Sequence, residues 1–310
     1  MLLHRNKEEF VKIVNVTSRS LGIDAGIVEK DYYVFMLLKL IRMYDEEIMF
    51  KGGTSLSKAW GILPRFSEDI DLNLLPEVPS TDSHRQKFAR SVYKSLIDMG
   101  FNYDYNKIAS RREYNTFEQP YDALFKNSVL NKNIIVETMA NKKGKILNAT
   151  YTPRLISNYI WDALSTNPKA ANTLKQFGLD PFVVNTQNMD VTFVEKVMSL
   201  TNRYLKGESN RLSRHLYDIY YMWTFGNLSS FNLRQTMSET KSHLLERTND
   251  ICLRQDRPAC MILLEALQSD FYKYDFNNVT MGMKFNQDGI TYEMCRDLLV
   301  YIVTNIVGEF

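Results

Sequence analysis

The chain has little of the chemistry that cysteine and histidine supply. Its 310 residues include three cysteines and four histidines, with no CxxC pair and no spacing typical of a metal site. A disulfide scaffold and a zinc module are therefore excluded. We expect the cysteines to be buried free thiols in a protein of the reducing cytoplasm, namely Cys252, Cys260 and Cys295.

Long apolar runs are also missing. The best candidate, VFMLLKLI at residues 34–41, contains Lys39 and is far shorter than the ~20 residues of a membrane span. The N-terminal residues MLLHRNKEEF carry charges where a secretory signal needs an apolar core. We therefore expect a cytoplasmic protein that does not associate with a membrane.

Neither the charge nor the known phosphate-binding motifs of NTPases point to a function. The formal net charge of +2 is too small to indicate a nucleic-acid partner, so basic surface has to come from local clusters, and DNA is not an expected partner. No P-loop motif, long internal repeat or low-complexity segment occurs. The 45% hydrophobic and 24% charged residues are typical of a folded globular protein.

Hydrophobic periodicity divides the chain into two halves. In the first, it predicts helices at residues 7–21, 25–44 (with Asp24 as N-cap), 54–60 and about 83–99, and strands at 47–51, 68–75, 101–109, 112–121 and 129–140. In the second, it predicts helices at 153–166, 190–205, 211–224, 230–247, 256–273 and 290–307, with a short extended segment at 180–190. We predict an α+β fold with a mixed sheet in a domain of residues 1–150, followed by a helical domain of residues 151–310.

A Gly-Gly turn follows the strand at residues 47–51. Gly52 and Gly53 allow the backbone to approach a ligand closely, and the helix that follows would offer N–H donors to a phosphate. Thr54 and Ser55 add hydroxyl donors at the same place. By itself such a turn is weak evidence for phosphate binding.

Paired aspartates occur in the next strand, in the stretch FSEDIDLNLL of residues 66–75. Side chains two apart in a strand share a face, so Asp69 and Asp71 point the same way. At ~4 Å and an effective dielectric of ~20 they would repel by about 4 kcal/mol. One or two Mg²⁺ ions would relieve this repulsion, and we expect Glu137 to supply a third acid. The alternative is a pair of solvated carboxylates at a sheet edge.

Two further groups of charged residues lie in the second half. Lys196 occurs among apolar residues of one predicted helix. Arg211, Arg214, His215 and Asp218 follow at the spacing of a single helix face. They are interpreted either as an exposed Arg214–Asp218 ion pair or as a cationic wall for a triphosphate or RNA.

Four blocks in this order resemble the AbiEii/type IV toxin nucleotidyltransferases of the polymerase-β-like nucleotidyltransferase superfamily. They are EKDYYV, FKGGTSLSKAWGILPRFSEDIDL, TFVEKVMSL and SRHLYDIYYM, which span residues 29 to about 222. Fifteen residues separate Gly53 from Asp69, more than is general in that superfamily but in keeping with the subfamily.

The resemblance implies roles for individual residues. Gly53, Thr54 and Ser55 would form the phosphate-binding turn, with Gly52 beside them, and Asp69 and Asp71 would hold the metal. Lys196 would be the catalytic lysine and Asp218 a later essential aspartate, while Arg214 and His215 belong to the same block with less defined roles. The assignment of Glu137 as a metal ligand is ours and does not come from the resemblance.

The resemblance also implies a toxin with a cognate antitoxin encoded by a neighbouring gene, acting in phage defence by abortive infection. Its NTP would be GTP or a pyrimidine triphosphate, and its acceptor an RNA, with the 3′ end of tRNA favoured. Our own candidates for contact with the RNA phosphates are Arg111, Arg112, Lys142, Lys143 and Lys145; the alternative for each is a solvated loop charge. Two alternatives stay open: transfer to a small molecule or a protein, and a GTP-binding module without turnover.

Overall fold

In this computed structural model, residues 2–102, 112–127, 130–140, 151–244, 251–285 and 288–308 are described, without the side chains of residues 242–244. These residues form two compact units. The first contains residues 2–61, 66–140 and 151–186, and the second contains residues 62–65 and 187–308. Within the described part of the chain, none of the helices combines the length and apolar character needed to span a lipid bilayer.

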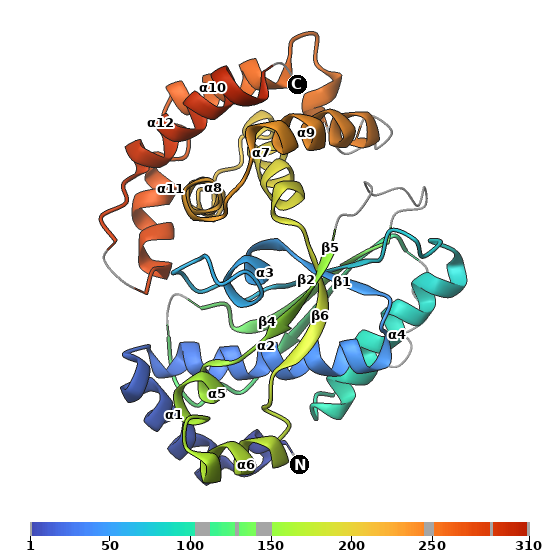
Figure 1. Ribbon diagram of the computed structural model, residues 1–310, viewed down its shortest axis with the longest axis vertical. Helices are drawn as coiled ribbons and strands as arrows, with labels where there is room; N and C mark the ends of the chain where they lie inside the picture. Colours follow the sequence, from blue (N-terminus) through green and yellow to red (C-terminus); the bar gives the residue numbers. More distant parts are fainter. Residues whose placement is uncertain are drawn as a thin grey trace. The chain divides into compact units, whose positions relative to one another are not determined.

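The first unit is built on a six-stranded mixed sheet with the order β3-β4-β2-β1-β6-β5. Its strands are β1 (Ile48–Lys51), β2 (Ile70–Leu74), β3 (Tyr114–Pro120), β4 (Asn133–Met139), β5 (Tyr151–Ile156) and β6 (Phe182–Gln187). Its helices are α1 (Lys7–Leu21), α2 (Ala25–Tyr44), α3 (Gly52–Lys58), α4 (Asp82–Asp98), α5 (Tyr159–Leu164) and α6 (Pro168–Gln176). In Figure 1, α2 runs beneath the strands and α3 lies above them. The predicted α+β fold with a mixed sheet is thus confirmed.

Capping residues explain why the first two helices have the predicted limits. The Asp24 side chain accepts a hydrogen bond from the N–H of Gly26 at 2.9 Å, as expected of an N-cap. Asn6 caps α1 in the same way, and Gly22 ends that helix in the left-handed conformation at φ +66°. The sequence therefore encodes both ends of α1 and the start of α2 locally.

The second unit is helical among its described residues. It contains α7 (Met189–Leu205), α8 (Arg214–Phe225), α9 (Ser230–Leu244), α10 (Ala259–Gln268), α11 (Lys273–Asn278) and α12 (Tyr292–Ile302). The 3₁₀ turns Ile251–Arg254 and Thr280–Met283 and the π turn Val303–Val307 join or extend these helices. Cys252, Cys260 and Cys295 are buried free thiols, as predicted.

The structure differs from the prediction around residue 150. Residues 153–156, which we predicted as the start of a helix at 153–166, belong to the edge strand β5. Residues up to 186 belong to the first unit because β6 pairs in parallel with the central strand β1, with Met49 opposite Asn185. The division between the units therefore falls near residue 187 rather than near 150. The predicted strand at 101–109 lies mostly outside the described residues.

Candidate active site

The Gly-Gly turn is packed directly against Asp71, the second of the paired aspartates. Gly52 follows β1 with φ +75°, a backbone conformation that residues other than glycine rarely adopt. A Cβ atom placed on Gly52 would lie 1.9 Å from Oδ2 of Asp71. The absence of a side chain at position 52 is therefore what allows the Asp71 carboxylate to lie against the turn.

Asp71 belongs to a row of polar side chains that crosses four neighbouring strands. The antiparallel β1–β2 pair places Lys51 opposite Asp71, and the parallel β2–β4 pair places Asp71 opposite Glu137. The β3–β4 pair then places Thr116 opposite Glu137. Because paired residues of neighbouring strands share a face of the sheet, these four side chains form one cross-strand row, Thr116–Glu137–Asp71–Lys51.

Asp69 comes just before β2 and is fixed through its backbone. Its carbonyl oxygen accepts a hydrogen bond from Oγ1 of Thr54 at 2.5 Å, while its residue remains half-buried. Ser55 Oγ donates to the carbonyl of Gly52 at 2.8 Å, and both hydroxyl residues are buried. We expected these hydroxyls to donate to a phosphate. Instead, they bond to the protein backbone and hold α3 to the turn and to the start of β2.

A tyrosine that the sequence analysis did not single out lies beside the row. Tyr114 is two residues before Thr116 on β3, and its hydroxyl accepts a hydrogen bond from Thr116 Oγ1 at 3.1 Å. Burial raises the pKa of Tyr114, and the nearby carboxylates of Glu137 and Asp71 raise it further. The tyrosine hydroxyl is therefore kept protonated at neutral pH beside Thr116 of the row.

The donor set fits a magnesium ion that also binds a phosphate. Among the described residues, no three or more histidine, cysteine, aspartate or glutamate side chains are gathered as a closed metal cluster. Mg²⁺ usually takes one or two carboxylates and completes its shell with water and substrate phosphate oxygens. Half-buried Asp69 and Asp71 beside the Gly-Gly turn meet that requirement, and Glu137 is the neighbouring acid in register with Asp71.

In the second unit, Asp218 is the centre of a buried ionic cluster. The Arg65 guanidinium donates to both carboxylate oxygens, at 2.7 and 2.6 Å, and Lys196 Nζ lies 2.8 Å from Oδ2. Asp218 and Arg65 are 0% and 1% exposed. Burial would raise the pKa of Asp218, but the charges of Arg65 and Lys196 outweigh it, so the pKa is lowered. The carboxylate is therefore ionised at neutral pH.

Lys196 and His215 extend this cluster. Burial lowers the pKa of Lys196, and the Asp218 carboxylate opposes that shift. Burial also lowers the pKa of His215 well below its usual value, and the charges of Lys196 and Arg214 act in the same direction. His215 is therefore neutral at pH 7, and its Nδ1 lies 3.3 Å from Lys196 Nζ as a hydrogen-bond acceptor.

The exposed Arg214–Asp218 ion pair that we considered is contradicted, because Asp218 is buried and its cations are Arg65 and Lys196. The predicted helix face is also shorter than expected. Arg211 lies before α8 with φ +59°, and its backbone N–H donates to Asp275 at 2.7 Å. Arg214 is the first residue of α8 and His215 the second.

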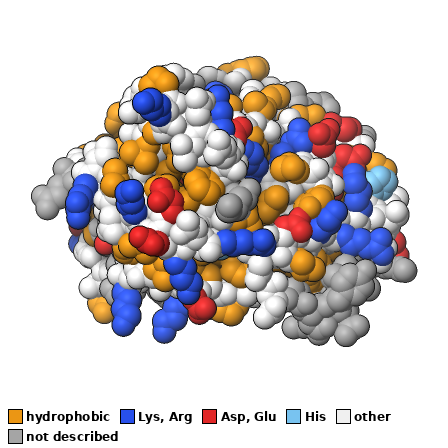
Figure 2. Space-filling view, turned by 90° about the horizontal axis from the view of Figure 1, so that it is seen from below, with side chains coloured by type: hydrophobic (Ala, Val, Ile, Leu, Met, Phe, Trp, Pro, Cys, Tyr) orange, Lys and Arg blue, Asp and Glu red, His pale blue; other side chains and the backbone are white. Residues whose placement is uncertain are grey.

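The predicted site residues divide between the two units. Gly52, Gly53, Thr54, Ser55, Asp69, Asp71 and Glu137 belong to the first, whereas Lys196, Arg214, His215 and Asp218 belong to the second. Arg112 is exposed, whereas Arg111, Lys142, Lys143 and Lys145 lie outside the described residues. On the face shown in Figure 2, Lys and Arg side chains alternate with Asp and Glu and form no continuous basic stripe among the coloured side chains.

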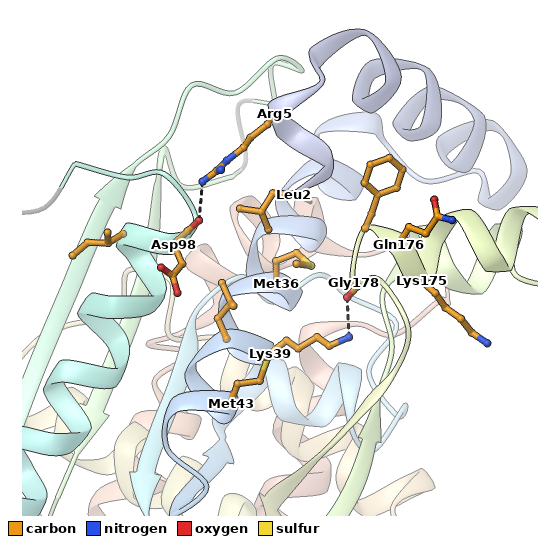
Figure 3. Close-up of a pocket in the computed structure, with 12 residues that line it drawn as sticks. Leu2, Arg5, Met36, Lys39, Met43, Asp98, Lys175, Gln176 and Gly178 are labelled. Atoms are coloured by element: carbon orange, nitrogen blue, oxygen red, sulfur yellow. Dashed lines mark hydrogen bonds between the residues drawn. The ribbon is translucent and has the colours of Figure 1, made fainter.

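One cavity of about 550 Å³ lies elsewhere in the first unit (Figure 3). It is lined by residues of α2, α4 and α6 and by their neighbours, including Met36, Lys39 and Lys175. None of the predicted site residues lines it. This cavity is therefore distinct from the site formed by the turn and the cross-strand row.

Sequence reasoning missed Arg65 and gave no role to Lys30. Arg65 occurs four residues before Asp69, but its partner Asp218 is 153 positions away. Lys30 lies within Glu29–Lys30–Asp31, three consecutive charges in an otherwise largely apolar helix. Burying charges is costly unless they are paired. From this triplet, buried partners for the three charges could therefore have been predicted.

A glycine turn beside Asp69 and Asp71, at the start of the next strand of the sheet, is the pattern on which the resemblance to nucleotidyltransferases rests. The family model described as "Nucleotidyl transferase AbiEii toxin, Type IV TA system" matches residues 40–272. The chain therefore belongs to the AbiEii nucleotidyltransferase toxin family, which implies a transferase and an antitoxin partner. This match confirms the resemblance inferred from the sequence.

Solved structures with similarity to the chain are distant. MenT4, a nucleotidyltransferase toxin from Mycobacterium tuberculosis H37Rv, is 14% identical with a TM-score of 0.44, covering 92% of this chain and 98% of that one. JHP933 from Helicobacter pylori is 10% identical with a TM-score of 0.35, covering 82% and 96%. No curated protein sequence matches the chain.

Proposed function

We propose that the protein is a Mg²⁺-dependent nucleotidyltransferase toxin that transfers NMP from an NTP to the 3′ end of an RNA, with tRNA as the preferred acceptor. The observation that carries the proposal is the packing of Gly52 against the Asp71 carboxylate, in register with Glu137 on the neighbouring strand. This arrangement brings backbone suited to a phosphate together with acids suited to a hard cation.

The reaction is a displacement at the α-phosphorus of the NTP. A hydroxyl oxygen of the acceptor forms a bond to that phosphorus, the bond to the bridging oxygen of the β-phosphate breaks, pyrophosphate leaves, and the hydroxyl loses its proton. Asp69 and Asp71, with Glu137, would hold one or two Mg²⁺ ions. When bound, Mg²⁺ supplies a positive charge that stabilises the oxygens entering and leaving the phosphorus.

The chain's own residues bind and orient the nucleotide in this proposal. Gly52 and Gly53 permit close approach of the backbone to the triphosphate, and Thr54 holds Asp69 in place through its carbonyl. Within the second unit, Asp218 fixes the Lys196 ammonium at 2.8 Å, and this lysine is our candidate for the catalytic lysine. Arg214 is a further candidate for phosphate contact.

The nucleotide is proposed to be GTP or a pyrimidine triphosphate. Among the residues that the structure describes, exposed Arg112 is our candidate for contact with the RNA backbone. The antitoxin is proposed to be the product of a neighbouring gene, and the biological role to be phage defence by abortive infection in the cytoplasm.

The direct experiment incubates the protein with Mg²⁺, each of four α-labelled NTPs and total bacterial tRNA. A matched tRNA sample is oxidised with periodate, which destroys the terminal 2′,3′-diol. We expect label from one preferred NTP in intact tRNA and none in oxidised tRNA.

Two other results would contradict the proposal. Equal labelling of oxidised tRNA would show that the 3′ end is not the acceptor. Binding of NTP without labelled RNA would favour a small-molecule or protein acceptor, or a GTP-binding module without turnover.

A further inference from the structure

Helix α2 carries three consecutive charged residues that are almost fully buried. Glu29, Lys30 and Asp31 are 0%, 0% and 1% exposed. Successive residues of an α-helix point about 100° apart, so the three side chains reach three different segments of the first unit. Burial of three charges is costly, and each must be compensated by specific partners.

Lys30 binds the segments that lead into the two acid-bearing strands. Its ammonium donates to the carbonyl oxygens of Asn131 at 2.9 Å and Asn133 at 2.6 Å, and lies 3.7 Å from Oε2 of Glu68. Glu68 Oε2 also accepts the backbone N–H of Asn131 at 2.8 Å. Lys30, Glu68 and the residues before β4 thus form one closed set of contacts, here called the Lys30 clamp.

The clamp joins the starts of β2 and β4. Glu68 immediately precedes Asp69, and Asn133 is the first residue of β4, four positions before Glu137. Asp71 and Glu137 are paired in the parallel ladder between these strands. The hydrogen bonds of a parallel ladder are evenly spaced, so by themselves they do not prevent one strand from shifting along the other. A contact that fixes the starts of both strands, as the Lys30 clamp does, helps to set which residues pair.

The neighbouring charges hold other segments. Glu29 accepts the backbone N–H groups of Leu124 and Phe125 at 2.9–3.1 Å. Asp31 pairs with Lys58, the last residue of α3, and accepts the N–H of Tyr159 at 2.9 Å. Of the three, Lys30 is therefore the residue whose contacts bear on the spacing of the acids.

We propose that Lys30 and Glu68 are positioning residues that set the spacing of Asp69 and Asp71 relative to Glu137, and hence the affinity of this site for a divalent cation. The functional consequence rests on the proposed metal-dependent transfer. The clamp itself is a property of the first unit and can be tested without any nucleotide.

The same helix offers a matched control. Lys39 Nζ also donates to a backbone carbonyl, that of Gly178, at 2.8 Å (Figure 3). It donates as well to the Asp180 carbonyl at 2.9 Å and to the Asp180 carboxylate at 3.0 Å. It thus makes the same kinds of contact as Lys30, but it holds the segment between α6 and β6. Lys39→Met removes an anchor with the same kinds of contact, in a more exposed setting, without touching the strand entries.

The experiment compares wild type, Lys30→Met, Lys39→Met and the double variant Lys30→Met/Glu68→Leu. Lys30→Met alone would leave the Glu68 carboxylate buried without its counter-charge. The double variant is included because it removes both charges of the pair. Two properties are measured on each protein. The first is hydrogen–deuterium exchange of peptides covering residues 130–139. The second is the affinity for Mn²⁺ alone, monitored by the electron paramagnetic resonance signal of the free ion.

We expect the folded variants that lack Lys30 to exchange at least ~10-fold faster than wild type over residues 130–139 and to bind Mn²⁺ at least ~10-fold more weakly. Lys39→Met should change exchange near residues 177–180 and leave Mn²⁺ affinity within about twofold of wild type. Unchanged exchange and unchanged Mn²⁺ affinity in the double variant would overturn the proposal. Wild type that binds no Mn²⁺ would contradict the proposed function, whereas the exchange comparison would still decide the clamp.

Discussion

Gly52 is the residue at which backbone conformation and the chemistry of the site are most tightly joined. Its left-handed φ and its contact with Asp71 are two separate reasons why position 52 requires glycine. A second glycine of the chain has the left-handed φ without such a contact. Gly61 has φ +65°, and a Cβ atom placed on it would have no neighbour within 4 Å. The pair therefore separates backbone strain from collision with the carboxylate.

We predict that Gly52→Ala reduces nucleotide transfer at least ~100-fold, because the new methyl group must displace the Asp71 carboxylate. Gly61→Ala should show only the backbone cost of about 1–3 kcal/mol in the free energy of unfolding and retain transfer within about threefold. Urea unfolding and the labelled-NTP assay measure the two effects. Equal activity losses in both variants would show that contact with Asp71 is not important.

Asp218 should be important for stability as well as for activity. Asp218→Asn leaves Arg65 and Lys196 buried without their counter-charge, and we expect a loss of about 3–5 kcal/mol in the free energy of unfolding. Asp275, which accepts hydrogen bonds from the backbone N–H groups of Arg211 and Ser213, is the comparison. Asp275→Asn should cost about 1–3 kcal/mol. Urea unfolding of both variants that showed the opposite order would contradict the buried cluster.

His215 predicts a pH dependence of stability. Its folded pKa is lowered well below 6.5, whereas the unfolded chain binds a proton near that value, so stability is fully present above pH 6.5 and falls as pH decreases below it. The groups around it are Lys196, Arg214, Arg65 and Asp218. Replacement by Gln should reduce the slope between pH 6.5 and 5 by up to about 1.4 kcal/mol per pH unit. An unchanged slope in urea unfolding would contradict a neutral, half-buried His215.

At the scale of secondary-structure elements, α3 is held to β2 by a hydroxyl rather than by apolar packing alone. Thr54 Oγ1 donates to the Asp69 carbonyl and to Ser67 Oγ. A second buried threonine, Thr17 in α1, has a hydroxyl with no hydrogen-bond partner among the described residues. These two threonines share side chain and burial but differ in hydrogen bonding.

Thr54→Val should therefore lower the free energy of unfolding by about 1–3 kcal/mol, because the Asp69 carbonyl loses a buried donor. Thr17→Val should be neutral or stabilising, since it removes a buried hydroxyl that has no partner. Thermal unfolding of the two variants gives the comparison. Equal destabilisation would mean that the hydroxyl of Thr54 does not hold α3.

The elements that the sequence predicted well are those with local signals. Both ends of α1 and the start of α2 follow from Asn6, Gly22 and Asp24, which act within a few residues. β5 was missed because Leu155 and Ile156 fit a helix as well as a strand, and because its partner β6 is about 30 residues further along. Pro153 in β5 is compatible with its place at the sheet edge.

At the scale of the whole molecule, the sequence predicted the pieces of the site better than their partners. Spacing alone predicted that Asp69 and Asp71 share a face, but only the strand register shows that Glu137 pairs with Asp71. Likewise, Asp218 was recognised, whereas its contact with Arg65 spans 153 positions and leaves no local pattern. Long-range pairing is decided by the fold as a whole, so a single sequence does not reveal it directly.

The proposed activity, metal-dependent transfer of a nucleotide, depends on the carboxylates of the first unit. The most direct measurement compares Mg²⁺-dependent incorporation of α-labelled NTP into tRNA by wild type, Asp71→Asn and Asp122→Asn. Asn keeps the size of Asp71 beside Gly52 but removes its charge, and Asp122 is an exposed carboxylate of the same unit. We expect Asp71→Asn to lose at least ~100-fold in incorporation and Asp122→Asn to keep wild-type activity. Incorporation by Asp71→Asn at the wild-type level and with the same Mg²⁺ dependence would contradict the proposed activity.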